Sequence, residues 1–336
     1  VAYEQLEELA FLVFYGFSQE VQDKLEESTI QKILEKAFSD TDAVRLLSIE
    51  KDDYKKELFS LYKDNIIDQY YGLKIQYLYP FISGKDFTYI PSPYLVVNAV
   101  TESMLNRVTF RDNKLRRAIG KEVIESYLYN IVRQLDTVTW ISPELLYKKG
   151  KDKLLTSDVI AAEGDNVIFY DTKAITPSLK LRKFDVAEIE ADIEIYAEDV
   201  IQIYNQINNY LQGCFQLDKQ YLKDKIFGIV VVLEDAVVSR KKVYEKVYEI
   251  LEKTETLDTE EKNYICSHIK VLPLRAIECM ILQNTSLLPE LIEQLSKPER
   301  WYDYTYTNAT IENGKIPLYS KYEKDLKSRI KNRIMG

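Results

Sequence analysis

The sequence predicts a mixed α/β fold, in which a β-sheet is flanked by helices and further helices precede and follow it. Residues 225–233 (KIFGIVVVL) carry apolar side chains on both faces, which is typical of a central strand covered by helices on both sides. Residues 155–175 contain two apolar runs separated by the turn-forming residues 163–166 (EGDN), which predicts a β-hairpin. Amphipathic patterns at 112–135 and 197–212 predict helices before and after this hairpin.

The chain divides into four regions. Residues 1–85 are expected to be helical, because Leu6, Leu9 and Val13 recur at helical spacing. Proline and glycine residues then interrupt the pattern, and we assign residues 86–111 to a linker or loop region. The remaining assignments are an α/β core at 112–280 and a helical C-terminal extension at 281–336. Within the core we expect, besides the elements above, a strand near 137–142, a helix at 240–253 and a strand at 269–273.

The predicted hairpin brings charged residues together. With a four-residue loop, Ala162 pairs with Val167. Counting outward from that pair places Asp158 opposite Asp171. Directly opposed residues point to the same face with Cβ atoms about 5 Å apart, and Lys173 joins that face because side chains alternate along a strand. Two carboxylates this close repel each other, and one lysine compensates only partly. A divalent cation held between the two acids accounts for the arrangement.

These three residues resemble the catalytic centre of the PD-(D/E)xK nuclease superfamily, in which an acid on one strand precedes an (Asp/Glu)-x-Lys motif on the next. Here the matching residues are Asp158, Asp171 and Lys173, and Ser157 stands where the superfamily often has proline. The resemblance implies a restriction-endonuclease-like mixed sheet, hydrolysis of DNA and a Mg²⁺ cofactor that Mn²⁺ can replace. Asp158 and Asp171 would be metal ligands, and Lys173 would stabilise negative charge on the phosphate.

The superfamily also places a helix with a metal-binding or water-orienting glutamate ahead of the hairpin. In the predicted helix at 112–135, one apolar arc runs from Val123 and Ile124 to Leu135. Glu125 falls at the edge of that arc and Glu122 on the opposite side. We therefore expect Glu125 to be the third acid of the site and a further metal ligand, and Glu122 to be solvated.

A second element of the resemblance lies downstream. Gln206 and Tyr210 match the Q-x-x-x-Y element of the RecB-like branch, which borders the active site in that branch. Their spacing of four residues places both on one helical face. The alternative is an ordinary amphipathic helix with an edge glutamine and a half-buried tyrosine, and the residues alone leave both interpretations open.

The net charge of −9 opposes a nucleic-acid enzyme, since phosphate backbones demand lysine and arginine. The basic residues are nevertheless clustered on both sides of the hairpin. We expect five of them to contact nucleic acid: Lys151, Lys153, Lys180, Arg182 and Lys183. The alternative is that these clusters are ordinary solvated surface.

Other functional classes lack their characteristic residues. Cys214, Cys266 and Cys279 have no paired spacing, which argues against a zinc site or a disulfide framework and favours a reducing cytoplasm. His268 is the single histidine and precedes an apolar run, so we expect a strand-edge residue and not a catalytic base. This argues against histidine-dependent nucleases and Ser-His-Asp triads. The apolar run at 10–15 is flanked by acids and is not a signal peptide, and no run is long enough to span a membrane.

The sequence therefore predicts a cytoplasmic, Mg²⁺-dependent nuclease acting on DNA, with RNA left open as a substrate and endonuclease action favoured over exonuclease action. A role in restriction or anti-phage defence is implied by the superfamily. The alternative is a non-catalytic nucleic-acid-binding or assembly subunit that retains the nuclease fold. A protein partner or a homo-oligomer is compatible with both, and no membrane is expected.

Overall fold

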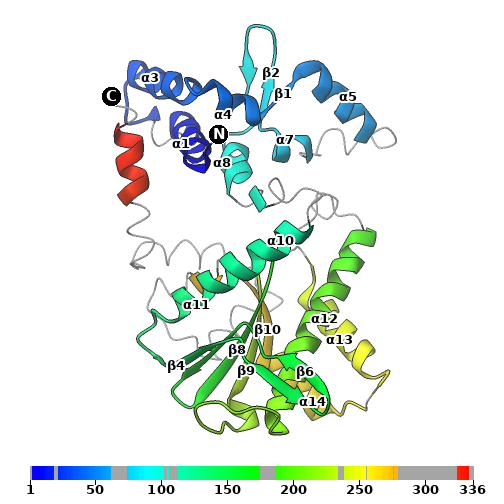
Figure 1. Cartoon of the computed structure of the whole chain (residues 1–336). Helices are drawn as coiled ribbons and strands as arrows, with labels where there is room; N and C mark the ends of the chain where they lie inside the picture. The colour runs from blue at the N-terminus through cyan, green and yellow to red at the C-terminus, as the bar shows by residue number, and fades with distance from the viewer. Residues whose placement is uncertain are drawn as a thin grey trace. The chain divides into compact units, whose positions relative to one another are not determined.

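The computed structural model describes residues 2–18, 22–61, 74–101, 104–105, 113–174, 186–233, 238–254, 256–274, 276–278 and 324–332. These residues belong to two compact units (Figure 1). Unit 1 comprises Val1–Asp112 with Pro317–Gly336, and unit 2 comprises Asn113–Ile316. Within the described ranges, none of the helices has the length and apolar character that crossing a membrane requires.

Unit 1 is mainly helical. Its helices are α1 (Tyr3–Phe17), α3 (Glu27–Phe38), α4 (Thr41–Leu46), α5 (Lys51–Leu61), α7 (Lys74–Leu78) and α8 (Pro93–Val100). The expected helical spacing near the N-terminus is confirmed, since Leu6, Leu9 and Val13 are buried on α1. The prediction of an all-helical region was incomplete, because three short strands form a small sheet in the order β1-β2-β3. These strands are β1 (Ser48–Glu50), β2 (Phe81–Ser83) and β3 (Thr88–Tyr89).

Two segments that we assigned elsewhere belong to the core of unit 1. The region 86–111, expected to be a linker, contains α8, whose Val96 and Val100 are buried in the same cluster as α1. Apolar packing outweighs the turn signal of the prolines here, since Pro93 is simply the first residue of the helix. Of the predicted C-terminal extension, the helix at 324–332 is described, and Ile330 packs against this cluster. Residues 281–323 lie outside the described part.

Unit 2 is a mixed α/β structure built on a five-stranded sheet with the order β10-β9-β8-β7-β4 (Figure 1). Strands β8, β9 and β10 are parallel, whereas β7 is antiparallel to both β8 and β4. The strands are β4 (Val138–Pro143), β7 (Val159–Glu163), β8 (Asn166–Lys173), β9 (Ile226–Val232) and β10 (Ile269–Pro273). Each strand that the sequence predicted is present, and all seven residues of β9 are buried, as expected of a central strand.

The hairpin β7–β8 has the predicted register, with Ala162 paired to Val167. Its loop is shorter than the four residues expected, because Glu163 also pairs with Asn166 and only Gly164 and Asp165 remain as the turn. Gly164 has a φ of 60°. This positive φ suits glycine and allows the two-residue turn that favours tight hairpins. The shorter loop leaves the facing of the two strands unchanged.

Helices cover this sheet. The long α12 (Val186–Leu211) packs on β9 and β10, where Gly228 provides room for Ile203: a Cβ atom at Gly228 would lie 2.3 Å from the Ile203 side chain. Helix α13 (Arg240–Leu251) packs on α12, and α14 (Thr259–His268) contacts β9 and β10. Ahead of β4 lie α10 (Asn113–Ile119), a π-helical segment η1 (Gly120–Glu125) and α11 (Ser126–Val132). A separate two-stranded sheet joins β5 (Leu146–Lys149) to β6 (Asp152–Leu155).

Candidate functional site

The last residues of β8 carry the centre of the candidate site. Asp171 and Lys173 lie on the face that α12 covers, and the Lys173 Nζ is 2.7 Å from the Asp171 Oδ2. The strand explains this contact, because residues two apart share a face. Asp171 is only 3% exposed, since β7 and β9 flank β8 and α12 lies over this face. The predicted placement of these two residues on one face is therefore confirmed.

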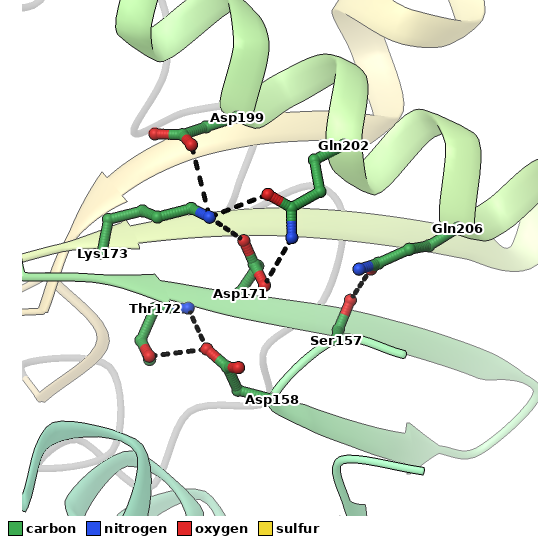
Figure 2. Close-up of polar contacts among 8 residues, drawn as sticks. All are labelled: Ser157, Asp158, Asp171, Thr172, Lys173, Asp199, Gln202 and Gln206. Carbon is green, nitrogen blue, oxygen red and sulfur yellow. Dashed lines mark hydrogen bonds and ion pairs between the residues drawn. The ribbon is translucent and has the colours of Figure 1, made fainter. Parts of the chain in front are cut away.

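Helix α12 adds two residues that the sequence reasoning missed. Asp199 Oδ1 lies 3.3 Å from the Lys173 Nζ, and Gln202 accepts a hydrogen bond from the same ammonium at 2.9 Å (Figure 2). The Gln202 Nε2 also donates to Asp171 Oδ1 at 3.4 Å. Lys173 therefore lies between two carboxylates and an amide. A sequence signal existed, because Asp199, Gln202 and Gln206 recur at spacings of three and four beside the apolar stripe of the helix.

Asp158 lies beside these residues but does not share the face of Asp171 in the way that we predicted. Its Oδ2 accepts hydrogen bonds from the Thr172 backbone N–H and the Thr172 hydroxyl, both at 2.6 Å (Figure 2). Strand β7 begins at Val159, so Asp158 has left the pleat and its carboxylate turns toward the two nearest donors. Asp158 thus has its hydrogen bonds with Thr172, while its negative charge still acts on Asp171.

The third predicted acid, Glu125, lies at the end of the π-helical segment η1, which contacts β8. One hydrogen bond and one close approach of the backbone place this part of the chain near the end of β8. Arg116 Nε donates to the Ala174 carbonyl at 2.9 Å, and a Cβ atom at Gly120 would lie 3.4 Å from that of Ala174. Glu125 is half-buried and Glu122 is exposed, as predicted. The π-helical turns shift the phase of the helix, so Val123, expected in the buried arc, is 57% exposed.

Burial makes the acids of this region hold protons more tightly than usual. It raises the pKa of Asp171 to about 6, an effect that nearby Asp158 reinforces and Lys173 opposes. It also raises the pKa of Asp199 to about 6. Burial, followed by the negative charge of Asp158, raises the pKa of Glu125 to about 7. Because the charge of Asp158 raises the pKa of both Glu125 and Asp171, the three acids interact electrostatically. Lys173 alone does not compensate this negative charge.

The two residues of the predicted Q-x-x-x-Y element have different surroundings. Gln206 accepts a hydrogen bond from the Ser157 hydroxyl, next to Asp158 in sequence (Figure 2). Tyr210 lies one turn further along α12, where its ring packs against Phe169 and Phe215. Its hydroxyl accepts from the Tyr221 N–H at 2.9 Å and donates to the Lys219 carbonyl. Tyr210 therefore packs in the core and binds the loop at 219–221, whereas Gln206 binds the residue before Asp158.

The predicted nucleic-acid contacts are only partly described. Lys180, Arg182 and Lys183 lie outside the described residues. Lys151 and Lys153 lie on the β5–β6 hairpin, where Lys153 pairs across the strands with Lys148. All three of these lysines are exposed, and none forms an ion pair within the described part of the chain. Like charges directly opposed across two strands destabilise a sheet, so this pair does not stabilise the hairpin.

The residues fit a hard divalent cation in donor chemistry. Carboxylate oxygens are the ligands that Mg²⁺ prefers, and Asp158, Asp171 and Glu125 supply them. One oxygen of Asp199 is buried without a hydrogen-bond partner in the described region. No group of three or more His, Cys, Asp or Glu residues there is arranged to hold a metal ion. Two carboxylates suffice for Mg²⁺, which retains several waters and takes further ligands from a substrate phosphate.

Comparison with known proteins adds no assignment to this geometry. No protein-family model matches the chain, and no curated protein matches it.

Proposed function

We propose that unit 2 is a metal-dependent nuclease with a restriction-endonuclease-like fold, which hydrolyses phosphodiester bonds in DNA. The observation that carries the proposal is the group of acids around the end of β8. Asp171, Asp199 and Glu125 all have pKa values raised by burial, and Lys173 is the ammonium that contacts two of them. An arrangement of this kind is unfavourable for folding alone and is characteristic of catalytic sites.

The residues have separate roles in this proposal. Asp158 and Asp171 would hold Mg²⁺, and Glu125 would be a further ligand or would orient the attacking water. When bound, Mg²⁺ would lower the pKa of a coordinated water and neutralise charge on the phosphate. Glu125 is suited to accept a proton near neutral pH, because its pKa is about 7. Lys173 would donate a hydrogen bond to a phosphate oxygen as negative charge develops there.

The β5–β6 hairpin supports a nucleic-acid substrate. Lys148, Lys151 and Lys153 are exposed and unpaired among the described residues, so their charge is available to phosphate groups. A basic hairpin on an acidic chain concentrates the attraction in one place. Action in the cytoplasm, in restriction or anti-phage defence, remains part of the proposal.

The second candidate is a non-catalytic nucleic-acid-binding or assembly subunit. The contacts of Lys173 favour it, because an ammonium already bound by Asp171, Asp199 and Gln202 contributes to structure without any metal. The two candidates differ in what a divalent cation does to the protein.

The test is a titration of supercoiled plasmid, linear duplex and RNA with Mg²⁺ and Mn²⁺, with EDTA as control. We expect nicking or linearisation of the closed plasmid, because it has no ends for an exonuclease. The parent should also melt at a higher temperature with Mn²⁺. A ligand that binds only the folded state, at a hundred times its Kd, adds about 2.7 kcal/mol to the free energy of unfolding. In Asp158→Asn both effects should disappear. Absence of cleavage and of any melting shift in the parent would favour the non-catalytic subunit.

A further inference from the structure

An open pocket lies between the β5–β6 hairpin and α12, beside the candidate site. Its volume is about 570 Å³, within the range of about 300–1,000 Å³ in which proteins bind small organic groups. The hairpin contributes Tyr147, Lys153, Leu154 and Leu155, and α12 contributes a row of carboxamides. In Figure 1, β6 lies in front of the lower part of α12.

The carboxamides fall into two groups. Asn209 is engaged, because it donates to the Tyr147 hydroxyl at 2.8 Å and accepts from Lys149 at 2.7 Å. It thus ties the hairpin to the helix and keeps the pocket walls together. Asn205 is exposed and forms no side-chain hydrogen bond within the described residues, and the Nε2 of Gln206 has no partner there either. A ligand that enters this pocket would therefore meet both a hydrogen-bond donor and a hydrogen-bond acceptor.

The opposite wall combines two leucines with one cation, Lys153. Leu154 and Leu155 line the pocket, and Leu155 is 46% exposed. A large exposed aliphatic side chain beside carboxamides suits a flat heterocycle, whose apolar face packs on the leucine and whose polar edge forms hydrogen bonds with the carboxamides. Glu198 also lines the pocket and offsets the charge of Lys153, so a phosphate there gains little net attraction. Glu198 can instead accept a hydrogen bond from the amino group of a base. The chemistry therefore fits a nucleobase better than a bare anion.

The pocket and the candidate site share residues. Gln202 lines the pocket, donates to Asp171 and accepts from Lys173. Gln206 also lines the pocket and accepts from Ser157, the residue before Asp158. A ligand in the pocket therefore lies next to the acids, and a polymer could occupy both places at once.

We propose that this pocket binds one unpaired nucleobase of single-stranded DNA, with the attached backbone leading to Asp171 and Lys173. The identity of the polymer rests on the proposed function. The base must be unpaired, because a base in a duplex is stacked and its pairing edge is already hydrogen-bonded. The basic hairpin holds the flanking phosphates through Lys148, Lys151 and Lys153.

The experiment measures binding of a fluorescent oligonucleotide by polarisation, in EDTA so that no cleavage occurs. The parent protein is compared on single-stranded DNA, on the same sequence as a duplex, and on a strand of equal length with abasic sites. We expect the single strand to bind at least about fivefold more tightly than the other two, because only it offers free bases. RNA of the same sequence should bind more weakly than DNA.

A matched pair of variants locates the effect. Asn205→Ala should weaken binding to single-stranded DNA about fivefold and should leave binding to the abasic strand unchanged, since it removes a contact to the base. Asn208→Ala, three residues along α12 and not part of the pocket lining, should change neither.

Equal binding of the normal and abasic strands would overturn the proposal, as would equal effects of the two variants or tighter binding of the duplex or of RNA. A failure of the nuclease proposal would give a different result. Base-dependent binding would persist, while no nucleic acid would be cut with either metal.

Discussion

Two clusters of buried charge, one in each unit, use a cation in different ways. In unit 1, Arg329 contacts Glu7 at 2.6 Å, Asp325 at 2.9 Å and Glu8 at 3.4 Å. In unit 2, Lys173 contacts Asp171 and Asp199 at 2.7 and 3.3 Å. The guanidinium offers five donors in a planar fork, whereas the ammonium is a compact charge with three.

Both clusters keep their cation charged, since Asp171 and Asp199 raise the pKa of Lys173 against the effect of its burial. Hydrogen bonding to Glu7 raises the pKa of Arg329, so the cluster of unit 1 holds its cation charged. In unit 2 burial raises the pKa of both aspartates in spite of Lys173, so that cluster retains protons near pH 6. The first cluster therefore joins the helix at 324–332 to α1, whereas the second joins β8 to α12 and contains two acids whose pKa values lie near 6.

The largest effect is expected from Lys173→Ala or Asp171→Ala. If the proposed function holds, either substitution should lower the rate of plasmid cleavage by about 10²–10³-fold, because the proposal assigns Lys173 to the phosphate and Asp171 to the metal. Melting curves should show a folded protein. Lys242→Ala is the control, because Lys242 forms an exposed ion pair with Glu190. This variant should cleave the plasmid at the parent's rate. Normal cleavage by both site variants would mean that the cluster of unit 2 is structural like that of unit 1.

Arg329→Ala tests the other side of the comparison. It leaves Glu7, which is 1% exposed, buried without its cation. We expect a loss of about 3 kcal/mol in the free energy of unfolding, measured by urea denaturation. Arg45→Ala removes an exposed ion pair with Asp42 and should lose less than about 0.5 kcal/mol. If both arginine variants were equally stable, the three ion pairs of Arg329 would not stabilise the packing of the helix at 324–332 on α1.

A smaller effect separates the two glutamates of η1. Glu125→Gln should slow cleavage by about 10–100-fold, because Glu125 is half-buried, interacts with Asp158 and has a pKa of about 7. Glu122→Gln should leave the rate nearly unchanged, since Glu122 is exposed. The measurement is the single-turnover rate of plasmid cleavage by each variant at saturating Mg²⁺. Equal rates for the two variants would remove Glu125 from the site.

The smallest effect concerns the dependence of stability on pH. An acid whose pKa is raised on folding destabilises the folded state as it loses its proton. For Asp199 this penalty develops as the pH rises from about 4 to about 6, and it is complete above that range. In EDTA, Asp199→Asn should therefore melt above the parent at pH 8 by a few degrees. The difference should shrink at pH 5, where Asp199 is largely protonated.

Asp165→Asn is the control for this measurement. The Asp165 side chain is 91% exposed in its ion pair with Lys219, so its replacement should change the melting temperature little at either pH. A parent that melts above Asp199→Asn at pH 8 would show that Lys173 outweighs the burial of Asp199.

Much of unit 2 followed from periodicity alone. Alternation along a strand placed Asp171 and Lys173 on one face, and the apolar runs marked β9 and β10. The pairing of Ala162 with Val167 needed only the turn and the two runs on either side. Helical spacing also distinguished half-buried Glu125 from exposed Glu122. These features are local, and each depends on residues that are close in sequence.

The remaining features depend on contacts between distant segments. Asp199 and Gln202 reach Lys173 only because α12 packs over the sheet, and Asp158 turns to Thr172 only because β7 starts one residue later. The same holds for the helix at 324–332, which is tied to α1 through Arg329 across more than 300 positions of sequence. Periodicity determines which side chains share a face. Tertiary packing determines which faces meet, because that depends on burial and charge summed over the whole unit.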